Sequence, residues 1–476
     1  MTSSSVARVS QLRGPLQHNS PSRRLRLPLA LLLLCALAPA ALAQKLAPRI
    51  PPPDSRYKAD ILVIVAHPDD ETLITGYLAH AIYDEHKRVA VAFCTWGRSG
   101  GNLVGEEQGL ALAAVREIEA RRALAYMGIH NVWYLGGRDH PGNDVLDSLE
   151  RWGEGAVLER AVRIIRLTRP EVVMTMAPDN DWGENHPDHH ASGVIATEAF
   201  DLAGNPTAFA EQVAPPRNRL GYANLTEGLQ PWQAEKLYYF SNANSHRYMD
   251  KYGPTFQVTG ICRAKGLTYA QIAAHEAAFH ATQQGTGDIA AASLRTGNYT
   301  FWNVPVQFVL AKTLVPAPPT ARVFAGVVPG PLPYSPPPGY RTAADPTLDR
   351  AIQLGNPWRF YRQLWAAHGL PQMPHLYEPE ETTGAGAILT VPLVLRNLSA
   401  RAARMRIQPV LPPGWRAVTA PELYPVAAGQ FYPLRFLVAV PKSAAAGWHQ
   451  LRWRAVGGGA DGAKVRTARL HVYVNR

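Results

Sequence analysis

The feature that most constrains the fold is an apolar run that leads directly into ionisable residues, Ile61 to Glu71 (Ile-Leu-Val-Ile-Val-Ala-His-Pro-Asp-Asp-Glu). An uninterrupted run of β-branched residues and Leu predicts a strand buried on both faces of a parallel sheet. Apolar residues at helical spacing follow over 71–86 and predict a helix. The polar residues between them therefore lie where ligands bind in open α/β sheets.

Three ionisable side chains crowd this strand-to-helix turn: His67, Asp69 and Asp70. Carboxylates held this close need a counter-charge, and a divalent cation supplies one. Asp70 alone is also consistent with a simple helix cap. Capping, however, needs neither the His nor a second Asp, so the whole cluster favours a metal site.

Strand and helix patterns alternate through the first half of the chain. Further strands are expected over 88–95, 132–135, 171–177 and 236–241, and helices over 107–127, 155–168, 187–200 and 269–282. Gly128 suits the position just past a helix end. This alternation predicts an α/β fold with a Rossmann-like, doubly wound, mainly parallel sheet.

A second polar cluster, His186-Pro187-Asp188-His189-His190, follows the strand expected over 171–177. Pro187 suits the first turn of a helix, and His186 and His189 are spaced to share a helix face. Together the two clusters predict one metal bound by His and carboxylate, with an open position for water, as in zinc hydrolases. Two His and one carboxylate also suit non-haem iron.

The second half of the chain changes character. Proline concentrates between 315 and 380, which predicts a linker over 316–383 with a short helix near 346–366. From 384 to 476, alternating segments predict a small all-β, immunoglobulin-like sandwich, with strands at 387–397, 403–410, 430–440, 447–456 and 464–474. This part has no cluster of ionisable residues, and core packing is the favoured role for its tryptophans, Trp415, Trp448 and Trp453.

The N-terminus has the pattern of a secretory signal peptide over 1–43. Arg23-Arg24-Leu25-Arg26 precedes an apolar stretch and then Ala41-Leu42-Ala43, a small-x-small cleavage site. We therefore expect export to the periplasm or the extracellular space after cleavage near Ala43. An extended lead-in over 44–59 and a catalytic domain over 60–315 follow.

Removal of this leader changes the charge balance. Its five arginines and lack of acids lower the formal net charge from +11 to +6 in the mature chain. No Lys/Arg cluster with interleaved aromatics is present, so nucleic-acid binding is not expected.

The apolar stretch is too short to span a bilayer, so we expect no transmembrane segment in the mature chain. Only Cys94 and Cys262 remain, too few for a Cys-based zinc site.

With both polar clusters in this order, the sequence resembles the PIG-L/LmbE family of zinc-dependent N-deacetylases. The resemblance spans about 60–285 and rests on Ala66-His67-Pro68-Asp69-Asp70-Glu71 with His186-Pro187-Asp188-His189. It includes Thr95-Trp96-Gly97 with its glycine-rich loop, Arg116-Glu117-Ile118-Glu119, and His280-Ala281-Thr282-Gln283. The C-terminal part separately resembles β-sandwich modules attached to secreted glycosidases.

This resemblance implies His67, Asp70 and His189 as ligands of one Zn²⁺, with another divalent metal such as Fe²⁺ as the alternative. It implies Asp69 as the general base that acts on the metal-bound water. Amide hydrolysis needs such a base, together with charge stabilisation on the carbonyl oxygen and an acid for the leaving amine.

The remaining roles also follow from the resemblance. His186, oriented by Asp188, would stabilise the oxyanion and protonate the leaving amine. Arg116 and Asp139 would contact sugar hydroxyls. Arg98 departs from the many relatives that carry Glu after Thr-x-Gly, and is a further expected substrate contact. His190 has no assigned role.

The function expected from these features is hydrolysis of a linear amide by an exported, metal-dependent enzyme. Its substrate would be the N-acetyl group of an N-acetylglucosamine-containing glycan or glycoconjugate, with acetate as product. The alternatives are an O-acetyl esterase or other small-amide hydrolase at the same metal, or a non-catalytic carbohydrate-binding protein. The sequence leaves the oligomeric state open.

Overall fold

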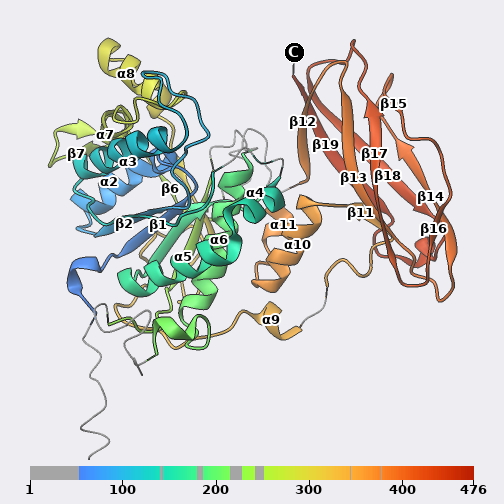
Figure 1. Cartoon of the computed structure of the whole chain (residues 1–476), viewed down its shortest axis with the longest axis horizontal. Helices are drawn as coiled ribbons and strands as arrows, with labels where there is room; N and C mark the ends of the chain where they lie inside the picture. The colour runs from blue at the N-terminus through green and yellow to red at the C-terminus, as the bar shows by residue number, and fades with distance from the viewer. Residues whose placement is uncertain are drawn as a thin grey trace, which may run out of the picture. The chain divides into compact units, whose positions relative to one another are not determined.

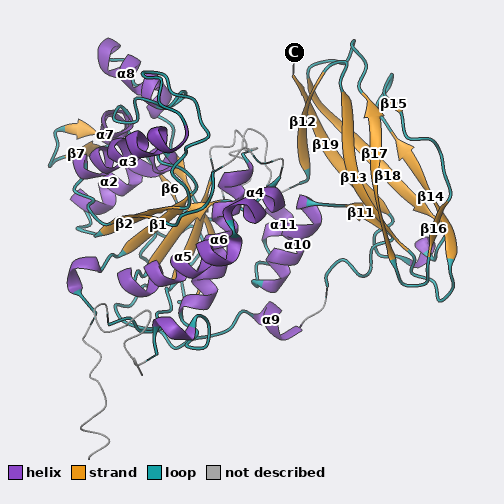
Figure 2. Ribbon diagram, in the orientation of Figure 1, coloured by secondary structure: helices purple, strands orange, loops and turns teal. Residues whose placement is uncertain are grey.

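A six-stranded sheet forms the centre of the N-terminal part of the chain (Figures 1 and 2).

The computed structural model describes residues 53–139, 142, 144–179, 186–214, 228–241, 251–342, 345–376 and 378–475. The expected signal peptide and most of the lead-in lie outside these residues. No described helix is both long and apolar enough to cross a membrane.

The strand order is β10-β5-β4-β1-β2-β3, and all neighbours are parallel except β10 and β5. The chain runs outward from β1 through β2 to β3, and then returns to β4 on the other side of β1. The predicted mixed α/β fold with a mainly parallel sheet is therefore confirmed. The strands are β1 (Ile61–Val65), β2 (Val89–Phe93), β3 (Val132–Tyr134), β4 (Val172–Met176), β5 (Lys236–Phe240) and β10 (Val309–Thr313).

Strand β1 is buried on both faces, as its composition predicts. Leu62 and Ile64 belong to one hydrophobic core and Ile61, Val63 and Val65 to another, because successive side chains point to opposite faces of a sheet. The first core is covered by α4 (Val145–Trp152), α5 (Glu154–Thr168) and α6 (Pro187–Ala203). The second is covered by α2 (Thr75–Tyr83), α3 (Gly109–Tyr126) and α7 (Tyr269–Ala277) (Figure 1).

Three local features differ from the expectations. The helix expected from residue 71 begins as a 3-10 turn, Asp70–Ile74, before α2. Helix α4 was not expected, although Asp144 caps it by accepting from the N–H groups of Leu146 and Asp147. Strand β10 was also not expected, and it adds an antiparallel edge to the sheet.

The stretch expected as a linker carries regular structure. Helices α10 (Pro357–Ala367) and α11 (Met373–Leu376) place apolar side chains in the core shared with α5 and α6. Strands β11 (Ile352–Leu354) and β12 (Glu380–Gly384) instead pair with strands of the C-terminal part. The stretch also contains α9 (Pro338–Thr342).

The C-terminal part consists of two sheets around one apolar core. One has the order β11-β13-β17-β15 and the other β12-β19-β18-β14-β16. Trp415 and Trp453 are buried in this core, whereas Trp448 is 38% exposed. The strands are β13 (Ile388–Arg396), β14 (Ala403–Val410), β15 (Arg416–Ala417), β16 (Tyr424–Val426), β17 (Phe431–Ala439), β18 (Gly447–Val456) and β19 (Thr467–Asn475).

Candidate active site

The two polar clusters meet at the carboxyl edge of the sheet. His67, Asp69 and Asp70 follow β1, and α6 begins at Pro187 after β4. Strands β1 and β4 are direct neighbours, with Val63 beside Met174. The strand order reverses here, which opens a crevice of the kind that holds ligands in α/β proteins.

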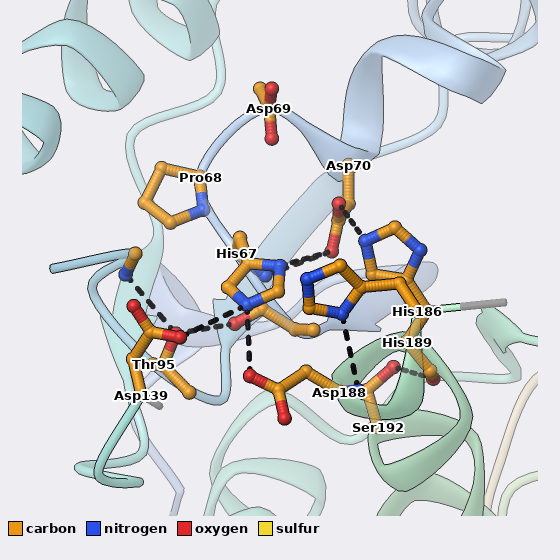
Figure 3. Close-up of polar contacts among 12 residues, drawn as sticks. His67, Pro68, Asp69, Asp70, Thr95, Asp139, His186, Asp188, His189 and Ser192 are labelled. Atoms are coloured by element: carbon orange, nitrogen blue, oxygen red, sulfur yellow. Dashed lines mark hydrogen bonds and ion pairs between the residues drawn. The ribbon is translucent and has the colours of Figure 1, made fainter. Parts of the chain in front are cut away.

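Asp70 joins the two clusters (Figure 3). Its Oδ1 lies 3.0 Å from Nε2 of His189, and its Oδ2 lies 3.9 Å from Nδ1 of His67. The backbone N–H of His67 donates to Oδ2 of Asp70 at 2.8 Å, which fixes the carboxylate between the two rings. The structure thus brings together the three residues expected to hold a metal.

The other ring nitrogen of His67 faces two carboxylates. Nε2 lies 3.1 Å from Oδ2 of Asp188 and 3.4 Å from Oδ1 of Asp139. Burial by itself lowers the pKa of His67, but these two contacts and the charge of Asp70 raise it to about 10. Carboxylates in this position commonly orient an imidazole whose other nitrogen binds a metal.

Asp188, which is expected to orient His186, also contacts His67. Asp188 lies in the first turn of α6, and its buried carboxylate reaches His67. It meets His186 through its backbone N–H, which donates to Nδ1 at 3.2 Å. Loss of hydration around the ring and the nearby imidazoles of His67 and His189 lower the pKa of His186 to about 4. The neutral ring then carries its proton on Nε2.

Asp69 adopts a left-handed backbone conformation, with φ of 108°. Its N–H donates to Oε2 of Glu71 at 3.0 Å, and its Oδ2 accepts from the hydroxyl of Thr286 at 3.0 Å. Burial and the charge of Asp70 raise the pKa of Asp69 to about 6. A non-glycine residue in this conformation needs such fixation, which here holds the expected base in place.

Behind Asp69 lies a fully buried group of charges. Nε2 of His280 lies 3.0 Å from Oε1 of Glu71 and 3.8 Å from Oε1 of Glu276. Burial alone lowers the pKa of His280, but the two carboxylates raise it well above its usual value. No role for these residues was expected, because the contacts join Glu276 of α7 and His280 just after it to Glu71 in the 3-10 turn, 209 positions before His280.

Arg116 holds the glycine-rich loop. Its guanidinium donates to the carbonyl oxygens of Gly97 and, at 3.0 Å, of Gly101. Gly97 has φ of +64°, a backbone conformation that favours glycine, and a Cβ there would lie 2.6 Å from Nη1 of Arg116 and displace that group. Asp139 accepts from the N–H of Ser99 at 2.6 Å and thereby joins this loop to His67.

These side chains surround a cavity of about 390 Å³, within the range of small-molecule sites. Arg116 and Asp139, two of the expected substrate contacts, line it, whereas Arg98 lines a separate cavity. His190 is buried and packs its ring against Tyr361 of α10. Lining residues from the expected metal and catalytic set are His67, Asp69, Asp70, His186 and His189.

The donor set fits a divalent metal. His67 and His189 offer imidazole nitrogens on either side of the Asp70 carboxylate, a combination that zinc and iron both accept. His67, His186 and His189 also form a group whose ligand atoms lie within 4.8 Å of one another. The structure therefore contains a candidate metal site that includes His67 and His189, two of the three predicted ligands.

Comparison with known proteins agrees with this geometry. Residues 62–200 match the family model described as PIG-L: GlcNAc-PI de-N-acetylase. The matched segment starts within β1 and ends within α6, so it includes both polar clusters.

Two curated relatives are similar over the same part of the chain. The 1D-myo-inositol 2-acetamido-2-deoxy-alpha-D-glucopyranoside deacetylase 1 of Frankia alni is 35% identical over 189 residues, 36% of this chain and 59% of the relative. The protein of the same description from Catenulispora acidiphila is 33% identical over 178 residues, 34% of this chain and 54% of the relative. The chain thus spans less than two thirds of the length of either relative.

Among solved structures, the N,N'-diacetylchitobiose deacetylase of Pyrococcus horikoshii aligns with a TM-score of 0.39 and 17% identity. The alignment covers 57% of this chain and 87% of that protein.

Proposed function

We propose that this protein is an exported zinc-dependent deacetylase that hydrolyses the N-acetyl group of an N-acetylglucosamine-containing glycan or glycoconjugate. The observation that carries the proposal is Asp70 between His67 and His189, in one cavity with Asp69. The family match over 62–200 and the deacetylase relatives support amide hydrolysis at this site.

In this proposal His67, Asp70 and His189 hold the metal. When bound, zinc supplies a Lewis acid and lowers the pKa of a coordinated water. Asp69 accepts the proton that the attacking water loses, and the Thr286 hydroxyl and the Glu71 carboxylate fix its position.

In this proposal His186 interacts with the amide carbonyl. Because its Nδ1 accepts from the backbone of Asp188, the neutral ring offers the Nε2 proton to the carbonyl oxygen as negative charge develops there. Protonation of the leaving amine, the second role expected for His186, requires the imidazolium form. Asp139 and Arg116 shape the sugar side of the cavity through the glycine-rich loop.

The direct test is acetate release from a panel of N- and O-acetylated sugars by the purified chain. We expect release from N-acetylglucosaminides, and Asp69→Asn should lower turnover by roughly two to four orders of magnitude while the metal is retained. Asp461→Asn, a change at an exposed site of the C-terminal part, is the matched control. Release from O-acetyl sugars alone would instead make the protein an esterase, and release from neither class would leave only carbohydrate binding.

Export is a separate part of the proposal. Its support is the pattern of Arg23-Arg24-Leu25-Arg26, the apolar stretch and Ala41-Leu42-Ala43. Mass spectrometry of the protein from the native cell should show an N-terminus near residue 44 in the exported fraction. An intact N-terminus in the cytoplasmic fraction would contradict export.

A further inference from the structure

A second cavity, of about 630 Å³, lies beyond the loops that border the first one. Trp96 and Arg98 line it from the loop after β2, and Arg138 from the loop after β3. Side chains of α3, among them Leu110, complete the wall. Both loops follow parallel strands, so this cavity opens at the same edge of the sheet as the candidate active site.

The two cavities share two loops in their walls. Gly97 and Ser99 line the first cavity, whereas Trp96 and Arg98 line the second. In the other loop Asp139 lines the first and Arg138 the second. Ser99 ties the loops together, since its N–H donates to the Asp139 carboxylate at 2.6 Å and its hydroxyl to the Asp139 carbonyl at 2.7 Å. A ligand in the second cavity therefore lies next to one in the first.

The second cavity carries an excess of positive charge. In the described part of the chain, neither Arg98 nor Arg138 forms an ion pair with an acid. The acid in the cavity wall, Glu117, is already engaged: Oε1 lies 2.8 Å from Nη2 of Arg121 and Oε2 accepts from Nε1 of Trp96 at 2.9 Å. Two guanidinium groups thus face a cavity whose carboxylate is neutralised.

Trp96 gives the same cavity a rigid aromatic surface. Its ring stacks on Tyr134 with centroids 5.0 Å apart and planes within 6° of each other. This stacking and the bond to Glu117 fix both angles of the side chain. Leu110, which is 76% exposed, adds apolar surface. A fixed indole beside apolar and cationic groups suits a ligand with both a flat apolar face and an anionic group.

We propose that the second cavity is a subsite for an anionic sugar residue, carrying a carboxylate or a phosphate, in the same glycan whose N-acetyl group enters the first cavity. The anion would bind the guanidinium groups of Arg98 and Arg138, which match carboxylate and phosphate oxygens in bidentate fashion. The sugar ring would lie on Trp96. This inference rests on the proposed function for the position of the N-acetyl group, but the subsite itself binds without catalysis.

Calorimetry on the full mature chain with the Asp69→Asn change measures this binding without turnover. The probes are a tetrasaccharide of alternating glucuronic acid and N-acetylglucosamine, neutral tetra-N-acetylchitotetraose, and N-acetylglucosamine 1-phosphate. We expect the anionic tetrasaccharide to bind at least ten times more tightly than the neutral one, with an affinity that falls as salt is added. Tighter binding of the phosphate probe than of N-acetylglucosamine itself would identify phosphate as the second anion accepted.

Variants at the two arginines locate the effect. Arg98→Ala with Arg138→Ala should remove the preference for the anionic tetrasaccharide and leave the affinity for the neutral one unchanged. The double variant Arg98→Lys with Arg138→Lys should retain part of the preference for the anionic tetrasaccharide. Arg122 is an exposed arginine elsewhere on α3, and Arg122→Ala should leave that preference unchanged. Equal affinity for both tetrasaccharides in the parent protein, or an equal loss for both in the double Ala variant, would overturn the subsite.

A probe without N-acetyl groups separates the two proposals. Trigalacturonic acid should bind through Arg98 and Arg138 even if the protein releases no acetate from any sugar. Such binding without acetate release would refute the deacetylase proposal alone. Acetate release with no binding of any anionic probe would refute the subsite alone.

Discussion

Nε2 of His67 lies 3.1 Å from the carboxylate of Asp188, although 121 positions separate the two residues in the chain. The carboxylate is fully buried, and its position fixes which imidazole nitrogen remains to face Asp70. This contact links the loop after β1 to the first turn of α6. Asp188 therefore contacts and orients the expected metal ligand His67.

Asp188→Asn should weaken metal binding by about 10- to 100-fold, because the amide no longer offers a charged acceptor to His67. The change keeps the size of the side chain, so the fold should be retained. Competition with a chelator of known affinity measures the effect. Unchanged metal affinity with reduced turnover would instead place the role of Asp188 at His186.

His189→Ala should remove most of the bound metal, because the metal would lose one of its three proposed ligands, the imidazole 3.0 Å from Oδ1 of Asp70. The parent protein should carry about one zinc per chain. Metal analysis of the dialysed variant is the measurement, and His130→Ala, at an exposed position, is the control. Full metal content in His189→Ala would show that this residue is not a ligand.

His280→Ala should destabilise the protein by about 3 to 5 kcal/mol, because Glu71 and Glu276 would remain buried without their shared cation. His280→Gln, which keeps a hydrogen-bond donor, should cost less. Urea unfolding followed by circular dichroism measures both variants. A loss within 0.5 kcal/mol for His280→Ala would mean that the two carboxylates are protonated in the folded chain.

Glu198 should make stability depend on pH. Burial and the charges of Glu154 and Asp201 raise its pKa from 4.5 to about 7. Between these values the folded chain holds a proton that the unfolded chain has released, so this group lowers stability as the pH rises.

Glu198→Gln should therefore stabilise the protein above pH 7 by about 1 to 3 kcal/mol and have little effect below pH 4.5. Chemical denaturation at both pH values is the measurement, with the exposed Glu211→Gln as control. An equal effect at both pH values would show that packing, not ionisation, is responsible.

The stretch over 357–376 should be required by the catalytic part. Tyr361, Trp365 and Met373 lie in the core shared with the central sheet. A fragment over 44–376 should fold and hold metal, whereas one over 44–345 should unfold at lower temperature or fail to fold, because it exposes that core. Thermal unfolding with metal analysis compares the two. Equal stability of both fragments would contradict this assignment.

The sequence alone determined the mainly parallel sheet and the residues at its carboxyl edge. The pattern of apolar residues along the chain indicates which side chains are buried, so β1 and the polar turn after it could be predicted from the sequence. The position of Pro187 likewise marked the start of α6. The family resemblance then implied His67, Asp70 and His189 as the metal ligands, and the structure brings these three residues together.

Only the tertiary structure decided how these residues are held. The Asp188 carboxylate contacts His67, and His280 contacts Glu71, although 209 positions separate them in the chain. Likewise, Arg98 and Asp139 lie in neighbouring loops but line different cavities. Local sequence patterns report which side chains are buried and on which element, but not the direction of a side chain or its distant partner. Those depend on the packing of strands and helices that meet only in the folded chain.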